Sequence, residues 1–268
     1  MEASAGDVSL RRLELVVYLQ SSDETELNGR LVVRLMFWPM FNPMYYLFAL
    51  PALLLGLYAQ FRVRSTYEKY QRVRNQGGLV GYEAAQRLLD YNDLRRVGVE
   101  ETPGQLSDHY DPRTKRLYLS SGVARSMSVA ALGVVAHEVG HALQDAQGYA
   151  PLKLRAGLVP VVQIGSWLGP ILFLVGMLLP AGPNLSLIGL LLFSGTLVFA
   201  LVTLPVEFDA SRRAVAMLRQ GRLLGTLEEE GVRAVLSAAA LTYVAAAAQA
   251  LSTILYYLFL LSGSRRRD

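Results

Sequence analysis

The segment His137-Glu138-Val139-Gly140-His141 contains the residues best suited to carry out chemistry. On a helix, side chains four positions apart lie on one face, so both imidazoles can reach a single metal ion, with Glu138 beside it. Zinc in a hydrolase takes three protein ligands and leaves one position for water, whose pKa falls to about 7. Glu138 would accept the proton of that water during attack on a carbonyl and pass it to the leaving amine. The spacing therefore predicts zinc-dependent hydrolysis of peptide bonds.

A third metal ligand is required, and the chain offers few candidates. It has no cysteine, and no histidine follows the motif, so we expect a carboxylate. Asp145 suits a contact behind the metal or a surface charge, and the run Glu228–Glu230 resembles an ordinary solvated helix start. Glu207 directly follows a long apolar segment that returns the chain to the same face of the membrane, and we assign it as the third ligand. Asp209 is either a partner that orients an imidazole or a plain charge near a helix start.

His109 is the remaining histidine, and it lies in or beside a predicted strand ahead of the motif. As a catalytic residue, it would donate a hydrogen bond to the developing oxyanion, or help an edge strand present the substrate. The alternative is a structural histidine in a turn. Tyr110 and Tyr149 are weaker candidates for the same role.

The positions of the charged residues indicate what must hold these side chains. The 268-residue chain is 52% apolar and 18% charged, and charges are absent from 35–61, 156–206 and 234–264. Each of these segments exceeds the roughly 20 apolar residues that span a bilayer. This pattern excludes an ordinary soluble domain and a disordered chain. It predicts a mainly α membrane protein with about four transmembrane or membrane-embedded helices.

The first predicted span is Met44–Phe61. The longest uncharged segment is broken at Pro180–Asn184 and predicts two helices, Leu158–Leu179 and Leu185–Leu204. The fourth apolar segment, Ala238–Leu261, is followed by the basic residues Arg265–Arg267. If this segment crosses the bilayer, the basic tail lies on the outer side, against the usual bias, so the segment either crosses or is re-entrant or interfacial. Lysine and arginine near the other span ends place both long polar segments in the cytoplasm.

The polar segment around the motif predicts a small cytoplasmic α+β region of zincin type. Residues 81–89 have helical periodicity, and Asn92 and Asp93 are its expected stop. Three β-prone runs, 97–101, 105–110 and 115–120, are separated by turn-forming dipeptides. We expect an antiparallel meander whose edge offers itself to an extended substrate.

Six segments follow from these patterns. Met36 opens the hydrophobic stretch directly, so we hypothesise that translation starts there and that the preceding residues are an artefact. The segments are 1–35, an N-terminal extension; 36–61, the first span; 62–155, the catalytic segment; 156–204, a transmembrane hairpin; 205–233, a cytoplasmic helix with the third ligand; and 234–268, a membrane helix and basic tail.

Five motifs occur along the chain in the order Met36–Pro39, Leu57–Gln60, Ser107–Pro112, Ala136–Gln144 and Leu204–Ser211. Together they resemble the bacterial YugP-like membrane zinc metallopeptidases, which are distantly similar to the HtpX proteases. The resemblance covers the chain from about Met36 onward and implies a zinc endopeptidase of the inner membrane. It implies two histidine ligands, a glutamate ligand and a catalytic glutamate, here His137, His141, Glu207 and Glu138. The HtpX-like pattern has an aspartate four residues after the ligand glutamate, where this chain has Ser211.

Three classes of function are open to a membrane protein with this motif. The leading one is an endopeptidase that acts on proteins or peptides at the cytoplasmic face of the plasma membrane, in contact with the lipid bilayer. The alternative is a non-proteolytic adaptor or chaperone with a structural or regulatory zinc site, but no fourth ligand of good spacing is evident. A transporter would need ionisable residues within its later spans, and these have none. No basic run with interleaved aromatics suggests nucleic acid.

Overall fold

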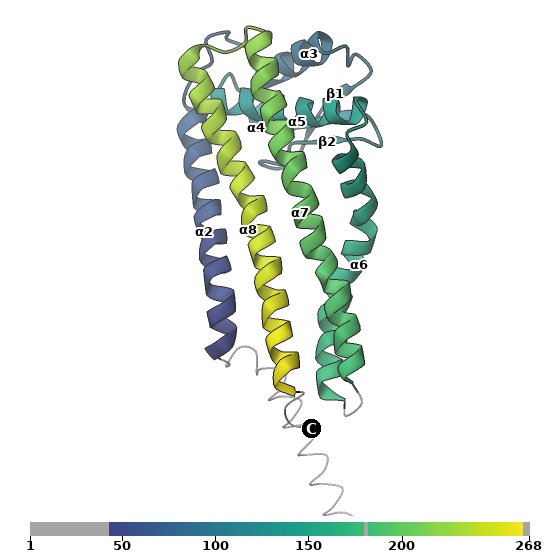
Figure 1. Cartoon of the computed structure of the whole chain (residues 1–268). Coiled ribbons are helices and arrows are strands. Elements are labelled where there is room, and N and C mark those ends of the chain that lie inside the picture. The colour runs from purple at the N-terminus through teal and green to yellow at the C-terminus, as the bar shows by residue number, and fades with distance from the viewer. Residues whose placement is uncertain (1–42, 180–181, 265–268) are drawn as a thin grey trace, which may run out of the picture.

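The structure is a computed structural model that describes residues 43–179 and 182–264. Four long helices form an elongated bundle, and a small mixed region, here called the head, lies across one end of it (Figure 1). The head comprises residues 72–149. The extension 1–35, the proposed start at Met36 and the basic tail from Arg265 lie outside the described residues.

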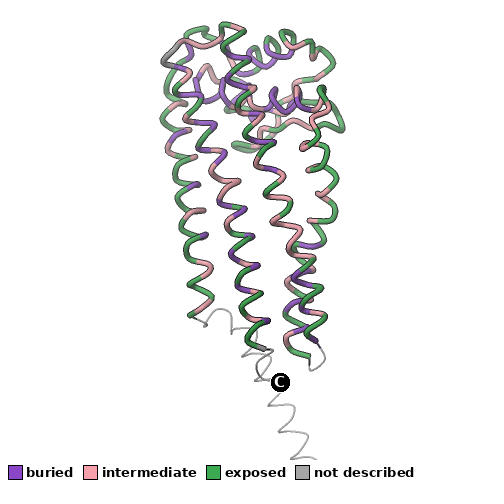
Figure 2. The backbone as a smooth tube through the Cα atoms, viewed as in Figure 1, coloured by how far each residue is buried: buried purple, intermediate pink, exposed green. Residues whose placement is uncertain are grey.

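The bundle confirms the predicted spans as helices. All four are long and apolar enough to cross a membrane. Most of their surface is exposed, whereas buried residues concentrate toward the head (Figure 2). Exposed apolar side chains over such lengths suit contact with lipid. The helices are α2 (Pro43–Gln71), α6 (Ala150–Leu178), α7 (Pro183–Gln220) and α8 (Thr226–Ser264).

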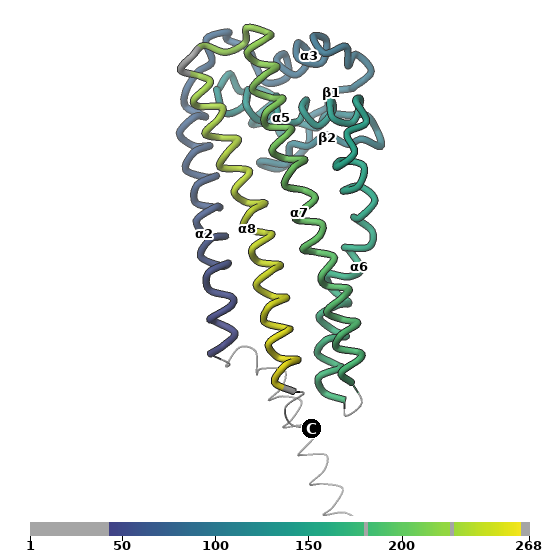
Figure 3. The backbone as a smooth tube through the Cα atoms, in the orientation of Figure 1, coloured from purple at the N-terminus to yellow at the C-terminus, as the bar shows by residue number. Residues whose placement is uncertain are grey.

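Helix α8 answers the question left open for the fourth apolar segment. It is one uninterrupted helix of 39 residues that runs along the bundle beside α2 and α7 (Figure 3). A re-entrant or interfacial segment would turn back or lie across the bundle end. By length and composition, α8 is therefore able to cross a membrane, as are the other three helices.

The prediction of a separate helix over 205–233 is wrong. Helix α7 continues through Pro205 and ends at Gln220, and α8 begins at Thr226. Proline removes one backbone donor and disturbs the carbonyl four residues earlier, a cost that packing can offset. Here the buried face is continuous across the proline, with Thr203, Val206, Glu207 and Ala210 at helical spacing. One straight helical face thus carries Glu207 from the membrane segment into the head.

Helices α6 and α7 approach so closely that their backbones touch. A Cβ atom on Gly169 would lie 2.8 Å from the carbonyl oxygen of Gly189, and one on Gly189 would lie 2.4 Å from the amide nitrogen of Phe173. Small residues permit this approach between membrane helices. The two helices therefore form a tightly paired hairpin.

The head is built around helix α5, whose buried face carries the motif. Ser128 caps α5, and its hydroxyl oxygen accepts a hydrogen bond from the amide of Ala131. Side chains from α3, β3 and the head end of α7 complete the core, including Leu88, Leu117 and Leu218. The predicted helix at 81–89 is confirmed as α3, with Asn92 at its C-cap. The head elements are α3 (Gly81–Tyr91), β1 (Gly98–Thr102), β2 (His109–Asp111), β3 (Arg116–Ser120), α4 (Ser121–Ala124) and α5 (Val129–Ala146).

The sheet is mixed, so the predicted antiparallel meander is wrong. Strand β3 is central; it pairs in parallel with β1 and antiparallel with β2. The turn dipeptides mark the ends of the strands correctly. The segment 103–108, with positive φ at Gly104 and Leu106, does not close a hairpin but carries the chain to the far side of β3. Strand β2 is consequently an edge strand, and it contacts α5.

Candidate metal centre

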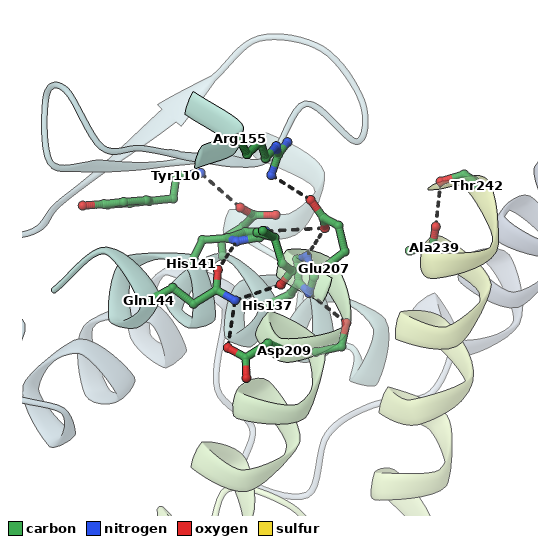
Figure 4. Close-up of polar contacts among 12 residues, drawn as sticks. Tyr110, His137, His141, Gln144, Arg155, Glu207, Asp209, Ala239 and Thr242 are labelled. Carbon is green, nitrogen blue, oxygen red and sulfur yellow. Dashed lines mark hydrogen bonds and ion pairs between the residues drawn. The ribbon is translucent and has the colours of Figure 1, made fainter. Parts of the chain in front are cut away.

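The motif residues reach one centre because α5 and α7 pack against each other at Gly140. A Cβ atom there would lie 2.7 Å from the carbonyl oxygen of Ala210. Glycine permits this approach, which brings Glu207 on α7 to His137 and His141 on α5 (Figure 4). The glycine inside the motif thus has a packing role.

The spacing of the three donor side chains suits a zinc ion. Oε2 of Glu207 lies 3.2 Å from Nε2 of His137 and 3.6 Å from Nε2 of His141. Tetrahedral zinc with bonds near 2.0 to 2.2 Å places its ligand atoms roughly 3.3 to 3.6 Å apart. One potential ligand atom from each of the three residues lies within 4.8 Å of the others. The group could therefore hold a zinc ion with three protein ligands.

The Glu207 carboxylate is almost fully enclosed, with 2% of the residue exposed. Its second oxygen, Oε1, accepts a hydrogen bond of 2.9 Å from Nη1 of Arg155 on α6. Burial by itself would raise the pKa of Glu207, but the hydrogen bonds and charges of the two histidines outweigh it and hold the pKa well below its ordinary value. Glu207 is therefore ionised, as a metal ligand must be.

Each imidazole is held from behind by a polar side chain. Oγ of Ser211 lies 3.2 Å from Nδ1 of His137, and Oε1 of Gln144 lies 3.0 Å from Nδ1 of His141. A histidine that offers Nε2 to a metal carries its proton on Nδ1, so both oxygens are placed to accept that proton's hydrogen bond. Sequence reasoning missed Gln144, and it noted Ser211 only as a departure from a pattern.

Asp209 contacts the centre indirectly. The amide of Gln144 donates to Oδ2 of Asp209 at 2.9 Å and to the carbonyl of Val206 at 2.8 Å. Asp209 thereby fixes which end of Gln144 faces His141. Of the two interpretations open from the sequence, the structure favours the orienting partner, acting through an intervening amide. The sequence feature that could have indicated this contact is the position of Gln144, three residues after His141 on the same helix, where the two side chains are neighbours.

Glu138 lies beside the two histidines, and its Oε2 accepts a 3.0 Å hydrogen bond from the backbone N–H of Tyr110 on β2. Burial raises the pKa of Glu138 above its ordinary value, although the adjacent His141 and His137 partly counteract it. An acidic group with a raised pKa beside a possible metal site is suited to accepting and returning a proton.

His109 is not brought to this group. Its ring stacks on Tyr118 with centroids 4.8 Å apart, and its Nδ1 lies 2.8 Å from the carbonyl oxygen of Ser107. The contact from this strand comes instead from the backbone of Tyr110. The Tyr110 hydroxyl donates to Asp145 at 2.7 Å, so Asp145 ties the edge strand to α5 rather than contacting the three donors.

A cavity of about 140 Å³ opens beside His137 and Glu138. Asp108 and Tyr243 contribute polar groups to its wall. Asp108 is itself held by the backbone amide of Ser120 at 2.7 Å. Most of the remaining lining is apolar. Helix α8 supplies Val235, Leu236, Ala239 and Ala240, and Leu106 and Val134 complete the apolar wall.

Comparisons with known proteins agree with this geometry. Residues 45–262 match the protein family described as "Putative neutral zinc metallopeptidase". The chain is also similar to the "Putative membrane protease YugP" of Bacillus subtilis (strain 168), with 46% identity over 214 residues, which cover 80% of this chain and 95% of that protein. No solved structure matches the chain.

Proposed function

Because the chain belongs to the neutral zinc metallopeptidase family, we propose that it is a membrane endopeptidase in which His137, His141 and Glu207 hold zinc and Glu138 is the general base. The observation that carries this proposal is the spacing of the three donors, which suits tetrahedral zinc with one position left over. When bound, zinc polarises the scissile carbonyl and lowers the pKa of a water molecule.

The residues around the three donors have separate roles in the proposed reaction. Glu138 accepts a proton from the attacking water and returns it to the leaving amine. The amide of Tyr110 keeps the Glu138 carboxylate oriented before substrate arrives. Strand β2 is an edge strand next to Glu138, and the Tyr110 N–H on its outer side already donates to Glu138. An extended peptide that pairs with this strand would therefore share or displace that contact. Protein or peptide segments that can extend along this edge are the proposed substrates.

The adaptor or chaperone alternative requires a structural zinc site, which fills four positions with protein ligands. Among the described residues, the group that could hold a metal ion has three members, His137, His141 and Glu207. This count supports a catalytic site over a structural one.

The test is Glu138→Gln, which preserves shape and removes the basic carboxylate. We expect zinc content equal to that of the wild-type protein and loss of casein cleavage. Cleavage at the wild-type rate would refute the general-base role. In parallel, Glu207→Ala is expected to lower zinc occupancy, and unchanged occupancy would remove it from the ligand set.

We further propose that the head faces the cytoplasm of a plasma membrane. Arginines and lysines cluster at the head ends of the long helices, whereas 43–61, 156–206 and 234–264 are uncharged. The chain has no cysteine, so a single exposed cysteine can report its side of the membrane. An Arg87→Cys variant on α3 should react with a membrane-impermeant maleimide only after cells are permeabilised. Labelling of intact cells would reverse the orientation.

A further inference from the structure

Resting on the ligand set proposed above, we propose that Arg155 is a positioning residue that makes Glu207 bind zinc through one oxygen only. By occupying the second oxygen, Arg155 would limit the metal to four ligand atoms, three from the protein and one from water. The role concerns the number of ligand atoms that Glu207 supplies, and not the strength with which the site holds its metal.

The two carboxylate oxygens of Glu207 have different partners. Oε2 faces both imidazole Nε2 atoms, at 3.2 Å and 3.6 Å, whereas Oε1 accepts from Nη1 of Arg155 at 2.9 Å. A carboxylate can bind a metal through one oxygen or through both, and zinc accepts a fifth ligand when one is offered. If Oε1 also bound the metal, the ion would have five ligand atoms with the water included, and it would polarise that water less strongly.

Burial makes this guanidinium hard to replace. Glu207 is 2% exposed, so bulk water has little access to Oε1. A buried acceptor that loses its donor seeks another partner, and the candidates here are the Tyr243 hydroxyl, which also hydrogen-bonds to Glu207, and the metal. Arg155 therefore sets the carboxylate in one of two available arrangements.

A purely structural role for the ion pair is less well supported. The pair joins α6 to α7, but these helices are already locked together by direct backbone contact at Gly169 and Gly189. The hairpin does not need Arg155 to form. Its paired backbones instead deliver both members of the ion pair to the same level, where the uncharged segment 156–206 ends on both sides.

The test compares Arg155→Met with Arg155→Lys in the full-length protein in detergent, loaded with cobalt(II) in place of zinc. Methionine keeps an unbranched apolar side chain, shorter than that of arginine, and removes the charge and the donors. Lysine restores the positive charge and N–H donors without the planar fork of the guanidinium. Four-coordinate cobalt(II) absorbs visible light more strongly than the five-coordinate ion, so the spectrum reports ligand number directly. Arg64→Met, which removes an exposed arginine on α2, is the matched control.

We expect Arg155→Met to retain cobalt affinity within about threefold of the wild-type protein, to lose visible absorption per bound ion, and to cleave casein at least tenfold more slowly. Arg155→Lys should recover most of both signals, and Arg64→Met should match the wild-type protein. A wild-type spectrum in Arg155→Met would overturn the inference, even if cleavage fell. Failure of that variant to bind cobalt at all would also overturn it, since Arg155 would then be needed for the site itself.

These outcomes are distinguishable from failure of the proposed function. If the wild-type protein binds neither zinc nor cobalt, or does not cleave, the peptidase proposal fails first. If the wild-type protein binds metal and cleaves, but Arg155→Met has the same cobalt spectrum as the wild-type protein, the peptidase proposal stands and the role of Arg155 is refuted. Thermal unfolding of the metal-free variants checks that α6 and α7 remain paired.

Discussion

Ser211 and His137 are joined by a 3.2 Å contact between Oγ and Nδ1, one helical turn beyond the point where Glu207 meets the other nitrogen of the same ring. Two residues one turn apart on α7 thus contact the two ring nitrogens of one imidazole. At this position the HtpX-like pattern has aspartate, whereas this chain has the neutral hydroxyl of serine. The tolerance of the site for this exchange can be measured.

We expect Ser211→Ala to lower zinc affinity about tenfold, because a partner that orients a ligating imidazole contributes on that scale. Ser211→Asp should bind zinc at least as tightly as the wild-type protein, since a carboxylate is a stronger acceptor. Competition with a coloured chelator measures both constants. Equal affinities in all three proteins would mean that the contact does not orient His137.

Gln144→Leu should weaken both folding and metal binding. Gln144 is fully buried and forms hydrogen bonds with His141, Val206 and Asp209. Leucine at this position would leave these buried polar groups without that partner. The expected loss is about 1 to 3 kcal/mol in the free energy of unfolding. Gln86→Leu, at an exposed position on α3, is the control and should change little. Denaturant unfolding and chelator competition of the two variants provide the comparison.

Gly140→Ala should separate α5 from α7 and so pull the two histidines away from Glu207. The added methyl group would lie 2.7 Å from a backbone carbonyl oxygen that cannot move aside freely. Overpacking of this kind costs about 1 to 3 kcal/mol. Gly133→Ala is the matched control on the same helix, because its methyl group would meet Val232 at an ordinary 3.4 Å. Lost zinc binding in Gly140→Ala alone is expected, and equal behaviour of the two variants would contradict the packing argument.

Glu229 provides a pH-dependent prediction at the junction of α7 and α8. Hydrogen bonds from Arg219 and Arg233 lower the pKa of Glu229 from 4.5 to about 2. A lowered pKa in the folded state means that the stabilisation is complete above about pH 4.5 and is lost as the pH falls toward 2. Glu229→Gln should therefore lower Tm at pH 7, and its difference from the wild-type protein should shrink below pH 4.5. A difference that stays constant down to pH 2 would exclude this ion pair as its source.

The sequence was sufficient for what depends on local pattern and composition. Helical spacing placed two imidazoles on one face of α5, and uncharged segments located four long helices. Glu207 was found by elimination, since few carboxylates follow the motif. Each of these inferences uses neighbours in the chain or the general cost of placing charge in lipid.

The sequence was insufficient for features that depend on contacts between segments far apart in the chain. Turn residues ended the strands correctly but could not decide on which side of β3 the chain continues. Pro205 suggested a helix start, yet a continuous buried face favours an unbroken α7. Arg155 and Gln144 resemble ordinary polar residues until the fold shows which side chains they face.

The paired backbones of α6 and α7 have a consequence for when the protein becomes competent. Glu207 and Arg155 both belong to this hairpin, whereas His137, Glu138 and His141 belong to α5 in the head. The proposed ligand set therefore joins two parts of the chain, and it is complete only when the hairpin has packed against the head. On that proposal, a newly made chain would begin to cleave only after this packing.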